Sequence, residues 1–319
     1  GKWEFKAPYH LTASDIQSIT INELLDLASD EDRDAFMNLY LGYTEIYGLP
    51  ELRREIADTY DTVEPEDILC FAGAEEGIYV AMRTLLDKGD HAIVVVPNYQ
   101  AAETIPLDIC QVSGVVLEED DNWQLDIDKV RAALRPTTKV ISVNFPNNPT
   151  GAILEHRRFE ALVELCRERG IYLFSDEVYR GVEMDPSVRL PQAVDAYEKG
   201  LSLNVMSKAY GLAGLRLGWI ACKDREQLQL LERTKLYLSL CNSAPSEQLA
   251  LIALRARNTI LERNRNLLRG NLEKLDSFFG EFPHLFDWKR PDGSAVAFPA
   301  YRGPGSTDTF CKELIDESG

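Results

Sequence analysis

The chain lacks the features that mark several large classes of protein. Its 319 residues include no apolar run near 18 residues long and no charged-then-apolar leader, so neither a membrane span nor secretion finds support. Cations are outnumbered, with 34 Lys and Arg against 52 Asp and Glu and a net charge of -18. Nucleic acids and acidic membranes are bound by clustered cations, so we expect neither as a partner. We expect a cytoplasmic protein.

Cysteine and histidine are too scattered to form a metal centre or a disulfide framework. The six cysteines include no close pair, and the four histidines include no pair at the spacing of metal ligands. The acidic cluster from Glu118 to Asp121 is better explained as a solvated turn than as a metal site. We therefore expect no metal.

The sequence does contain short β-branched runs that alternate with amphipathic segments. Strands are expected at 68–71, 92–96, 115–117, 140–143, 171–174, 201–205 and 217–221, and helices at 78–86, 127–134 and 159–169. Repetition of strand, helix and strand predicts an α/β fold, with a mostly parallel sheet and helices on both faces.

Lys208 is the residue with the most specific surroundings. It follows an apolar strand and enters a glycine-rich loop, and Arg216 comes shortly afterwards. Such a lysine suits a Schiff base beside a phosphate site, and pyridoxal phosphate is the cofactor that needs both. Taken alone, the segment is also compatible with a surface lysine in a turn.

Three further segments support the cofactor hypothesis. Residues 144–151 follow an apolar run and predict a strand that ends in a rigid turn. Asp176 and Tyr179 come at the carboxyl end of another apolar strand, where an acid is well placed for ligand chemistry. Gly73 lies in a small-residue turn before a predicted helix, whose free N–H groups can hold a phosphate.

In this order, the four segments resemble the class I/II aminotransferases of the aspartate aminotransferase superfamily, which are enzymes of pyridoxal-phosphate-dependent fold type I. The resemblance extends from about Tyr40 to Phe298 and rests on Asn-Pro-Thr-Gly, Asp-x-x-Tyr and Ser-Lys with the later arginine. It implies an enzyme that moves an amino group from an L-amino acid to a 2-oxo acid through a Lys208 Schiff base, with pyridoxal 5'-phosphate as the cofactor.

The resemblance also implies roles for the residues that match the family's motifs. Lys208 forms the Schiff base and later carries the proton between the substrate and the cofactor, so its pKa should be lowered by the site. Asp176 pairs with the pyridine nitrogen and keeps it protonated. Tyr179 and Asn148 hydrogen-bond the ring oxygen.

The cofactor phosphate is expected to be held by a second group of residues. Arg216 corresponds to the family's phosphate-binding arginine, and Ser207 can add a hydroxyl donor. Backbone N–H groups are expected from Gly73, Ala74 and Glu75, and the Glu75 side chain should point away from the phosphate. Val205 stands where many relatives carry a hydroxyl residue, which indicates that the phosphate is held more lightly or that a donor is supplied from elsewhere.

Two tyrosines complete the expected site. Tyr99 resembles the aromatic residue that stacks on the pyridine ring. Tyr43 resembles the tyrosine that reaches the phosphate of a neighbouring subunit, so the resemblance implies a homodimer with shared active sites.

The expected domain organisation follows the same family. Residues 1–25 would form the N-terminal segment of a small domain, residues 26–265 the large cofactor-binding domain, and residues 266–319 the small C-terminal α/β domain. The stretch from Ser246 to about Phe279 has helical periodicity, and its middle is expected to link the two domains.

Other functions stay open. The opening segment at 12–18 differs from the glycine-containing segment usual in plain aminotransferases, which favours a lyase, a cyclase similar to capreomycidine synthase, or an oxidase as the alternative. A regulator built on this fold is disfavoured because no basic helix-turn-helix segment is present. A plain binding protein would have no reason to keep all the motifs.

The substrate carboxylate has no evident anchor. Relatives use an arginine near their C-terminus, and Arg302 comes too early and lies in a predicted surface turn. We expect the natural protein to continue beyond Gly319 with this arginine, and the start at Gly1 suggests missing N-terminal sequence. The identities of the amino acid and of the acceptor therefore stay open.

Overall fold

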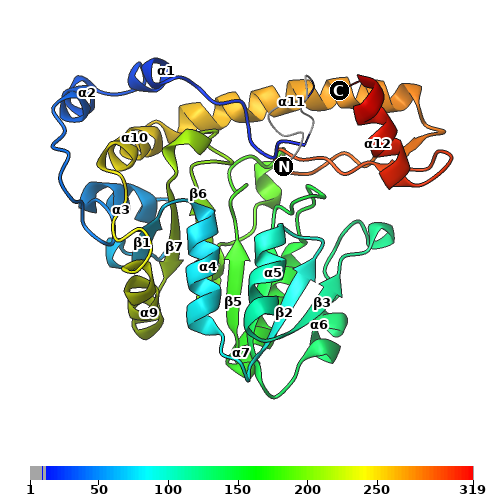
Figure 1. Cartoon of the computed structure of the whole chain (residues 1–319), viewed down its shortest axis with the longest axis horizontal. Helices are drawn as coiled ribbons and strands as arrows, with labels where there is room; N and C mark the ends of the chain where they lie inside the picture. The colour runs from blue at the N-terminus through cyan, green and yellow to red at the C-terminus, as the bar shows by residue number, and fades with distance from the viewer. Residues whose placement is uncertain (1–8, 10–11, 319) are drawn as a thin grey trace.

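The computed structural model describes residue 9 and residues 12–318. Seven strands form its central sheet in the order β1-β7-β6-β5-β4-β2-β3 (Figure 1). The strands are β1 (Ile68–Phe71), β2 (His91–Val96), β3 (Gln111–Val116), β4 (Thr138–Asn144), β5 (Tyr172–Asp176), β6 (Gly200–Val205) and β7 (Gly218–Cys222). All pairings from β3 to β6 are parallel, and β7 is antiparallel to both of its neighbours. This confirms the mostly parallel sheet.

All seven expected strands are present, and their limits differ most at the edge of the sheet. β3 begins at Gln111, four residues before the predicted start at Val115. It is an edge strand in which Gln111, Gly114 and Val116 are exposed. Its first four residues include only one β-branched residue, so they lack the run of β-branched residues by which a central strand is recognised in the sequence. β7 extends from Gly218 to Cys222, one residue later than predicted.

Helices cover both faces of the sheet, as predicted. Side chains along β2 alternate between two hydrophobic cores, with Ile93 and Val95 in one and Ala92 in the other. The helices are α1 (Ile21–Leu25), α2 (Asp30–Met37), α3 (Pro50–Ala57), α4 (Ala74–Leu85), α5 (Gln100–Ile109), α6 (Ile127–Ala133), α7 (His156–Arg169), α8 (Ala193–Ala196), α9 (Arg225–Lys235), α10 (Ala244–Arg255), α11 (Arg257–Glu281) and α12 (Thr307–Ser318). Four short 3₁₀ turns are η1 (Pro65–Asp67), η2 (Glu119–Asp121), η3 (Pro186–Val188) and η4 (Ala213–Leu215).

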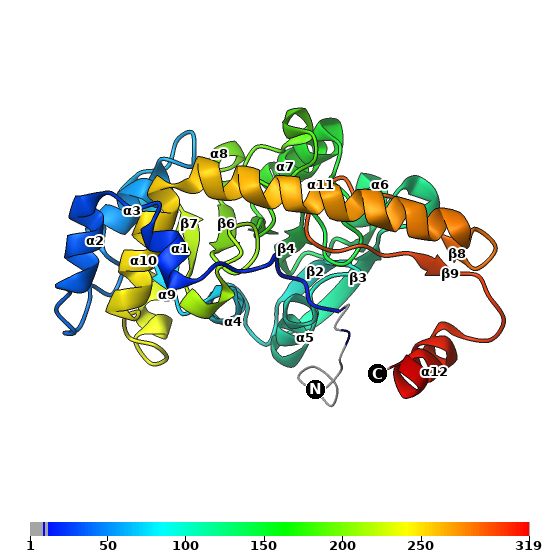
Figure 2. The ribbon, with the colours of Figure 1, turned by 90° about the horizontal axis from the view of Figure 1, so that it is seen from above.

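The helical stretch predicted from Ser246 consists of two helices. α10 ends at Arg255, and α11 then continues for 25 residues along one side of the molecule (Figure 2). The domain boundary expected between residues 265 and 266 falls inside α11. The division into domains stays a prediction. Beyond α11, β8 (Phe286–Asp287) pairs with β9 (Ala300–Tyr301). No helix in the described part of the chain is both long and apolar enough to cross a bilayer.

Candidate active site

A cavity of about 370 Å³ opens at the carboxyl edge of the parallel strands. The predicted site residues that line it are Ala74, Glu75, Tyr99, Asn148, Asp176, Tyr179, Ser207, Lys208 and Arg216. Its volume lies within the range of small-molecule sites, from about 300 to 1,000 Å³. The structure therefore brings together residues that are more than 140 positions apart in the sequence.

The sheet explains how these side chains meet. β4 and β5 are parallel and in register at Asn144 and Asp176, and β5 is paired with β6 at Asp176 and Leu203. Residues at or just after the carboxyl ends of these strands consequently share one edge of the sheet. Asp176 is the last residue of β5, and Lys208 follows β6 by three residues.

The Lys208 amine lies in the cavity beside the N-terminal segment. Its Nζ donates a hydrogen bond to Ser14 Oγ at 2.7 Å. Burial lowers the pKa of Lys208, and the negative charges of Asp15 and Asp176 oppose this in part. A lowered pKa increases the neutral fraction of the amine, which is the form that acts as a nucleophile or a base.

Asp176 is a buried carboxylate with an exposed fraction of 4%. Burial raises its pKa to about 6, although the backbone N–H of Val178 and the charge of Lys208 both lower it. The side chain of Asn144 also donates to the Asp176 carbonyl at 3.0 Å, which fixes the end of β5. A carboxylate held in this way is suited to pair with a cationic ring nitrogen, which would compensate for its burial.

Tyr179 and Asn148 line the same cavity as Lys208. The Tyr179 hydroxyl is buried and donates to the backbone carbonyl oxygen of Ser14 at 2.7 Å. The backbone N–H of Asn148 donates to Asn144 Oδ1 at 2.6 Å, so the turn after β4 is tied to the strand. The amide side chain of Asn148 is thereby positioned on the wall of the cavity.

The part of the cavity around Arg216 has the features of a phosphate site. Gly73 precedes the first turn of α4, whose free N–H groups favour an anion. Gly73 has φ of +94°, and a Cβ there would lie 2.4 Å from Arg216 Nη2, so glycine is required for the guanidinium to approach. Arg216 Nη1 also lies 3.4 Å from Ser207 Oγ. The residues present therefore fit a phosphorylated cofactor.

Glu75 and Tyr99 interact at the side of the cavity. Burial, and then a hydrogen bond with the Glu75 carboxylate, raise the pKa of Tyr99 to about 12. Glu75 is thus directed at Tyr99, and the phenol of Tyr99 stays protonated at neutral pH. An aromatic ring held in this way can cover the face of a flat cofactor.

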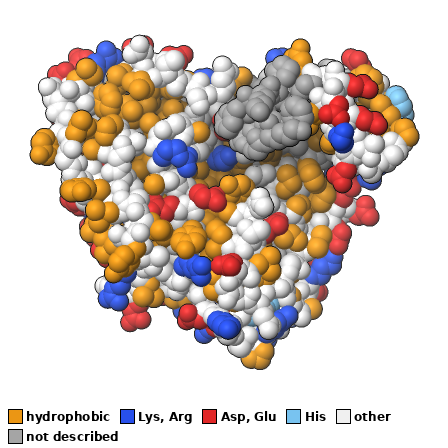
Figure 3. Space-filling view, in the orientation of Figure 1, with side chains coloured by type: hydrophobic (Ala, Val, Ile, Leu, Met, Phe, Trp, Pro, Cys, Tyr) orange, Lys and Arg blue, Asp and Glu red, His pale blue; other side chains and the backbone are white. Residues whose placement is uncertain are grey.

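Tyr43 does not belong to the cavity of its own chain. Its exposed fraction is 91%, and it lines a separate hollow with Leu41 and Pro245. Figure 3 shows hydrophobic side chains gathered at the upper left of the molecule, in the region where Figure 1 places α1, α2 and α10. Arg302 is exposed as well, and it pairs with Asp287 and Glu119 rather than with any residue of the cavity.

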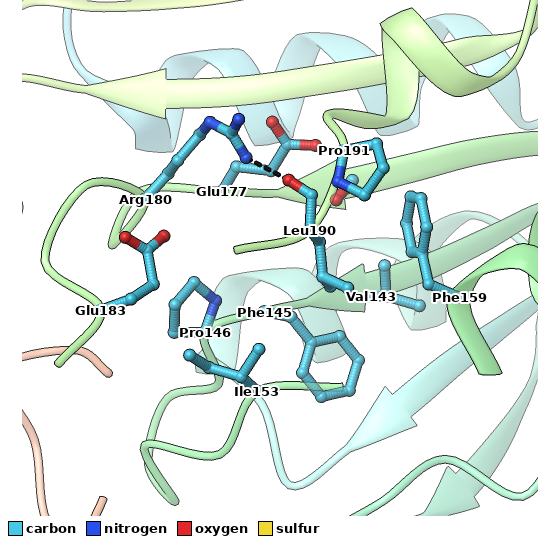
Figure 4. Close-up of a pocket in the computed structure, with 11 residues that line it drawn as sticks. Val143, Phe145, Pro146, Ile153, Phe159, Glu177, Arg180, Glu183, Leu190 and Pro191 are labelled. Atoms are coloured by element: carbon cyan, nitrogen blue, oxygen red, sulfur yellow. Dashed lines mark hydrogen bonds between the residues drawn. The ribbon is translucent and has the colours of Figure 1, made fainter. Parts of the chain in front are cut away.

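A second, much smaller cavity of about 20 Å³ is lined in part by Val143 of β4 and Ser175 of β5 and is large enough for one water molecule. Figure 4 shows Glu177 and Arg180 at its upper side, with Phe145 and Ile153 opposite. Glu177 Oε1 accepts hydrogen bonds from the Ala193 N–H and from the Ser202 hydroxyl, whereas its Oε2 has no partner in the described part of the chain. This cavity is too small for a substrate.

Ser14 and Asp15 are site residues that sequence analysis did not identify. Ser14 contacts Lys208 and Tyr179, and Asp15 lines the cavity. The sequence feature that could have pointed to them is that residues 12–18 differ from the glycine-containing segment usual in plain aminotransferases. No group of three or more potential metal ligands occurs among residues 12–318.

Comparisons with known proteins agree with this geometry. The family model for aminotransferases of class I and II matches residues 15–319. A probable aspartate aminotransferase of Methanocaldococcus jannaschii is 26% identical over 284 residues, which cover 86% of this chain and 74% of that protein. An arginine–pyruvate transaminase of Pseudomonas aeruginosa is 29% identical over 293 residues, covering 87% and 72%.

Solved structures show the same fold. A PLP-dependent aminotransferase from Streptococcus suis aligns with a TM-score of 0.91 and 33% identity, covering 98% of this chain and 83% of that one. The aspartate aminotransferase of Thermotoga maritima aligns with a TM-score of 0.85 over 96% and 80% of the two chains, at 23% identity. The chain belongs to the family of class I and II aminotransferases, which confirms the fold type, the activity and the pyridoxal phosphate cofactor.

Proposed function

We propose that this PLP-dependent aminotransferase attaches its cofactor to Lys208 and exchanges amino groups between an L-amino acid and a 2-oxo acid in the cavity described above. The observation that supports this assignment is the placement of Lys208 and Asp176 in one cavity together with Arg216, whose guanidinium packs against Gly73. When bound, pyridoxal phosphate supplies the electron sink for the reaction.

Each residue of the cavity contributes a separate physical task. Arg216 and the first turn of α4 bind the phosphate through a guanidinium and backbone N–H groups. Asp176 would keep the pyridine nitrogen protonated, because its buried carboxylate is stabilised by a cationic partner. Tyr179 and Asn148 orient the ring through its oxygen. The Lys208 amine, whose neutral fraction is increased because burial lowers its pKa, moves the proton at the substrate α carbon.

The attachment can be tested by reduction with borohydride followed by mass spectrometry. Lys208 should carry the label, and Lys208→Ala should abolish both the label and the visible absorbance of the bound cofactor. Lys235 is a suitable internal control because it is fully buried and its pKa is also lowered by burial, yet it lies outside the cavity. A label on Lys235, or an unchanged label in the Lys208 variant, would contradict the assignment.

Tyr43 leads us to propose a homodimer with shared sites. Its side chain is almost fully exposed, and exposed Met37, Tyr40 and Leu41 precede it in the sequence. A second copy of the chain would cover this apolar surface and would bring Tyr43 to the phosphate bound by Arg216 of its neighbour. Mixing Tyr43→Phe protein with Lys208→Ala protein should restore activity, because each mixed dimer has one site free of both changes. A fully active monomer would refute the shared site.

The activities of the relatives suggest which amino donors to test. L-aspartate and L-arginine are the first candidates, with pyruvate as an acceptor. Transfer is established by formation of the new amino acid in step with the loss of the donor. Release of ammonia or a cyclised product without a new amino acid would favour the lyase or cyclase alternative.

A further inference from the structure

The segment from Thr12 to Ile19 leads to α1 and passes above the sheet (Figure 2). Asp15 of this segment lines the cavity. Ile16 is 3% exposed and belongs to a hydrophobic core. The carbonyl oxygen of Gln17 accepts a hydrogen bond from Arg263 Nη1 of α11 at 3.1 Å. These contacts fix the course of the segment where it passes the cavity.

Ser14 in this segment contacts two groups of the proposed catalytic site. Its backbone carbonyl oxygen accepts a hydrogen bond from the Tyr179 hydroxyl, and its own hydroxyl oxygen accepts one from Lys208 Nζ, both at 2.7 Å. In the part of the chain that the structure describes, Ser14 Oγ is the hydrogen-bond partner of the Lys208 amine. Asp15 and Asp176 act on that amine through their charges, as does Arg216.

We propose that Ser14 is a positioning residue for the proton transfer, because its hydroxyl holds the Lys208 amine whenever the amine is free. This inference rests on the proposed role of Lys208. A lysine side chain has several rotatable bonds, and the amine must lie at the substrate α carbon when it gives or takes the proton. A hydrogen bond to a fixed hydroxyl restricts the amine to one region of the cavity, which lowers the entropic part of the barrier.

The two contacts of Ser14 can be separated experimentally. Ser14→Ala removes the hydroxyl that contacts Lys208 but keeps the backbone carbonyl that holds Tyr179. Ser14→Thr restores a hydroxyl on the same carbon. Thr12→Ala removes a hydroxyl from an exposed position of the same segment and is the matched control.

The first measurement uses protein without cofactor. Reductive methylation of Lys208 by formaldehyde and borohydride, followed by mass spectrometry, reports how freely the amine reacts. Ser14→Ala should react several times faster than the wild type, because its amine has lost its hydrogen-bond partner. Ser14→Thr and Thr12→Ala should react at the wild-type rate.

The second measurement uses the holoenzyme. Exchange of the substrate α hydrogen with solvent should slow by about tenfold in Ser14→Ala at saturating amino acid, with KM and cofactor affinity unchanged, and Ser14→Thr should restore it. Wild-type rates in Ser14→Ala in both assays would overturn the inference, and so would a slow Ser14→Thr variant beside a slow Ser14→Ala variant. Failure of the borohydride label to appear on Lys208 in the wild type would instead refute the proposed function.

Discussion

Glu177 offers a quantitative test of how burial controls ionisation next to the active site. Its carboxyl group is 5% exposed, and burial raises its pKa from 4.5 to about 7, with the charge of Arg180 opposing the change. Because Oε2 has no hydrogen-bond partner in the described residues, the charged form is incompletely stabilised. The folded protein therefore binds this proton more tightly than the unfolded chain does.

The sign of the pH effect follows from linkage. Between pH 4.5 and about 7, the folded state holds more protons at Glu177 than the unfolded state, so this group destabilises the fold progressively as the pH rises. The full cost above pH 7 is about 3 kcal/mol, from about 1.4 kcal/mol for each pH unit. Glu177→Gln has a similar shape and cannot ionise. Glu177→Gln should therefore stabilise the fold relative to the wild type, and this gain in the free energy of unfolding should be larger at pH 8 than at pH 5 by roughly 2 to 3 kcal/mol.

Urea denaturation of both proteins at pH 5 and pH 8 measures this difference directly. Glu160→Gln, at an exposed position of α7, controls for the loss of one negative charge from an acidic protein. Equal stabilisation of Glu177→Gln at the two pH values would show that Glu177 is ionised in the folded protein throughout, and the reasoning from burial would be wrong.

Three other predictions concern the cavity. Asp176→Ala should retain part of its cofactor affinity but raise the barrier to α-hydrogen exchange by roughly 3 kcal/mol, because a preorganised charge is lost, and wild-type exchange rates would show that the role is misassigned. Gly73→Ala should weaken the binding of pyridoxal phosphate at least about tenfold, since a Cβ 2.4 Å from Arg216 Nη2 displaces the guanidinium. Gly214→Ala is its control, because an added Cβ there meets no atom within 4 Å, and equal affinities of the two variants in a fluorescence titration would contradict the proposed phosphate site. The pH at which cofactor-free Lys208 becomes reactive should lie below that of an exposed lysine such as Lys88, because burial lowers the pKa of Lys208, and identical labelling profiles would refute this.

The sequence was sufficient to predict the parts of the site that depend on local pattern. Lys208 and Asp176 follow apolar runs that form central strands, and parallel strands place their carboxyl ends at one edge. α5 was not predicted, and it contains Pro106, a residue that usually argues against a helix interior. Ser14 could not be placed either, because its contact with Lys208 joins residues 194 positions apart.

Contacts at such distances depend on how the whole chain packs. Ile16 enters a core formed mainly by residues from Leu52 to Ile260, and this burial brings Ser14 to the cavity. Nothing in the local sequence of residues 12–18 specifies that destination. The burial of Glu177 is similarly invisible in the sequence, because an acid at a strand end is exposed in most proteins.

The charges of the cavity explain why the site is suited to a cofactor of this chemistry. Burial drives both Asp176 and Lys208 toward their neutral forms, so neither charge is well stabilised by the protein alone. Arg216 has no carboxylate partner among the described residues and contacts Ser207 and the Ala213 carbonyl instead. In the proposed site, a ligand that carries a dianion, an aldehyde and a basic ring nitrogen would have a partner for each of these three groups. The burial that makes the charges of Asp176 and Lys208 costly without a ligand would, under the proposed assignment, make each of these residues selective for one part of pyridoxal phosphate.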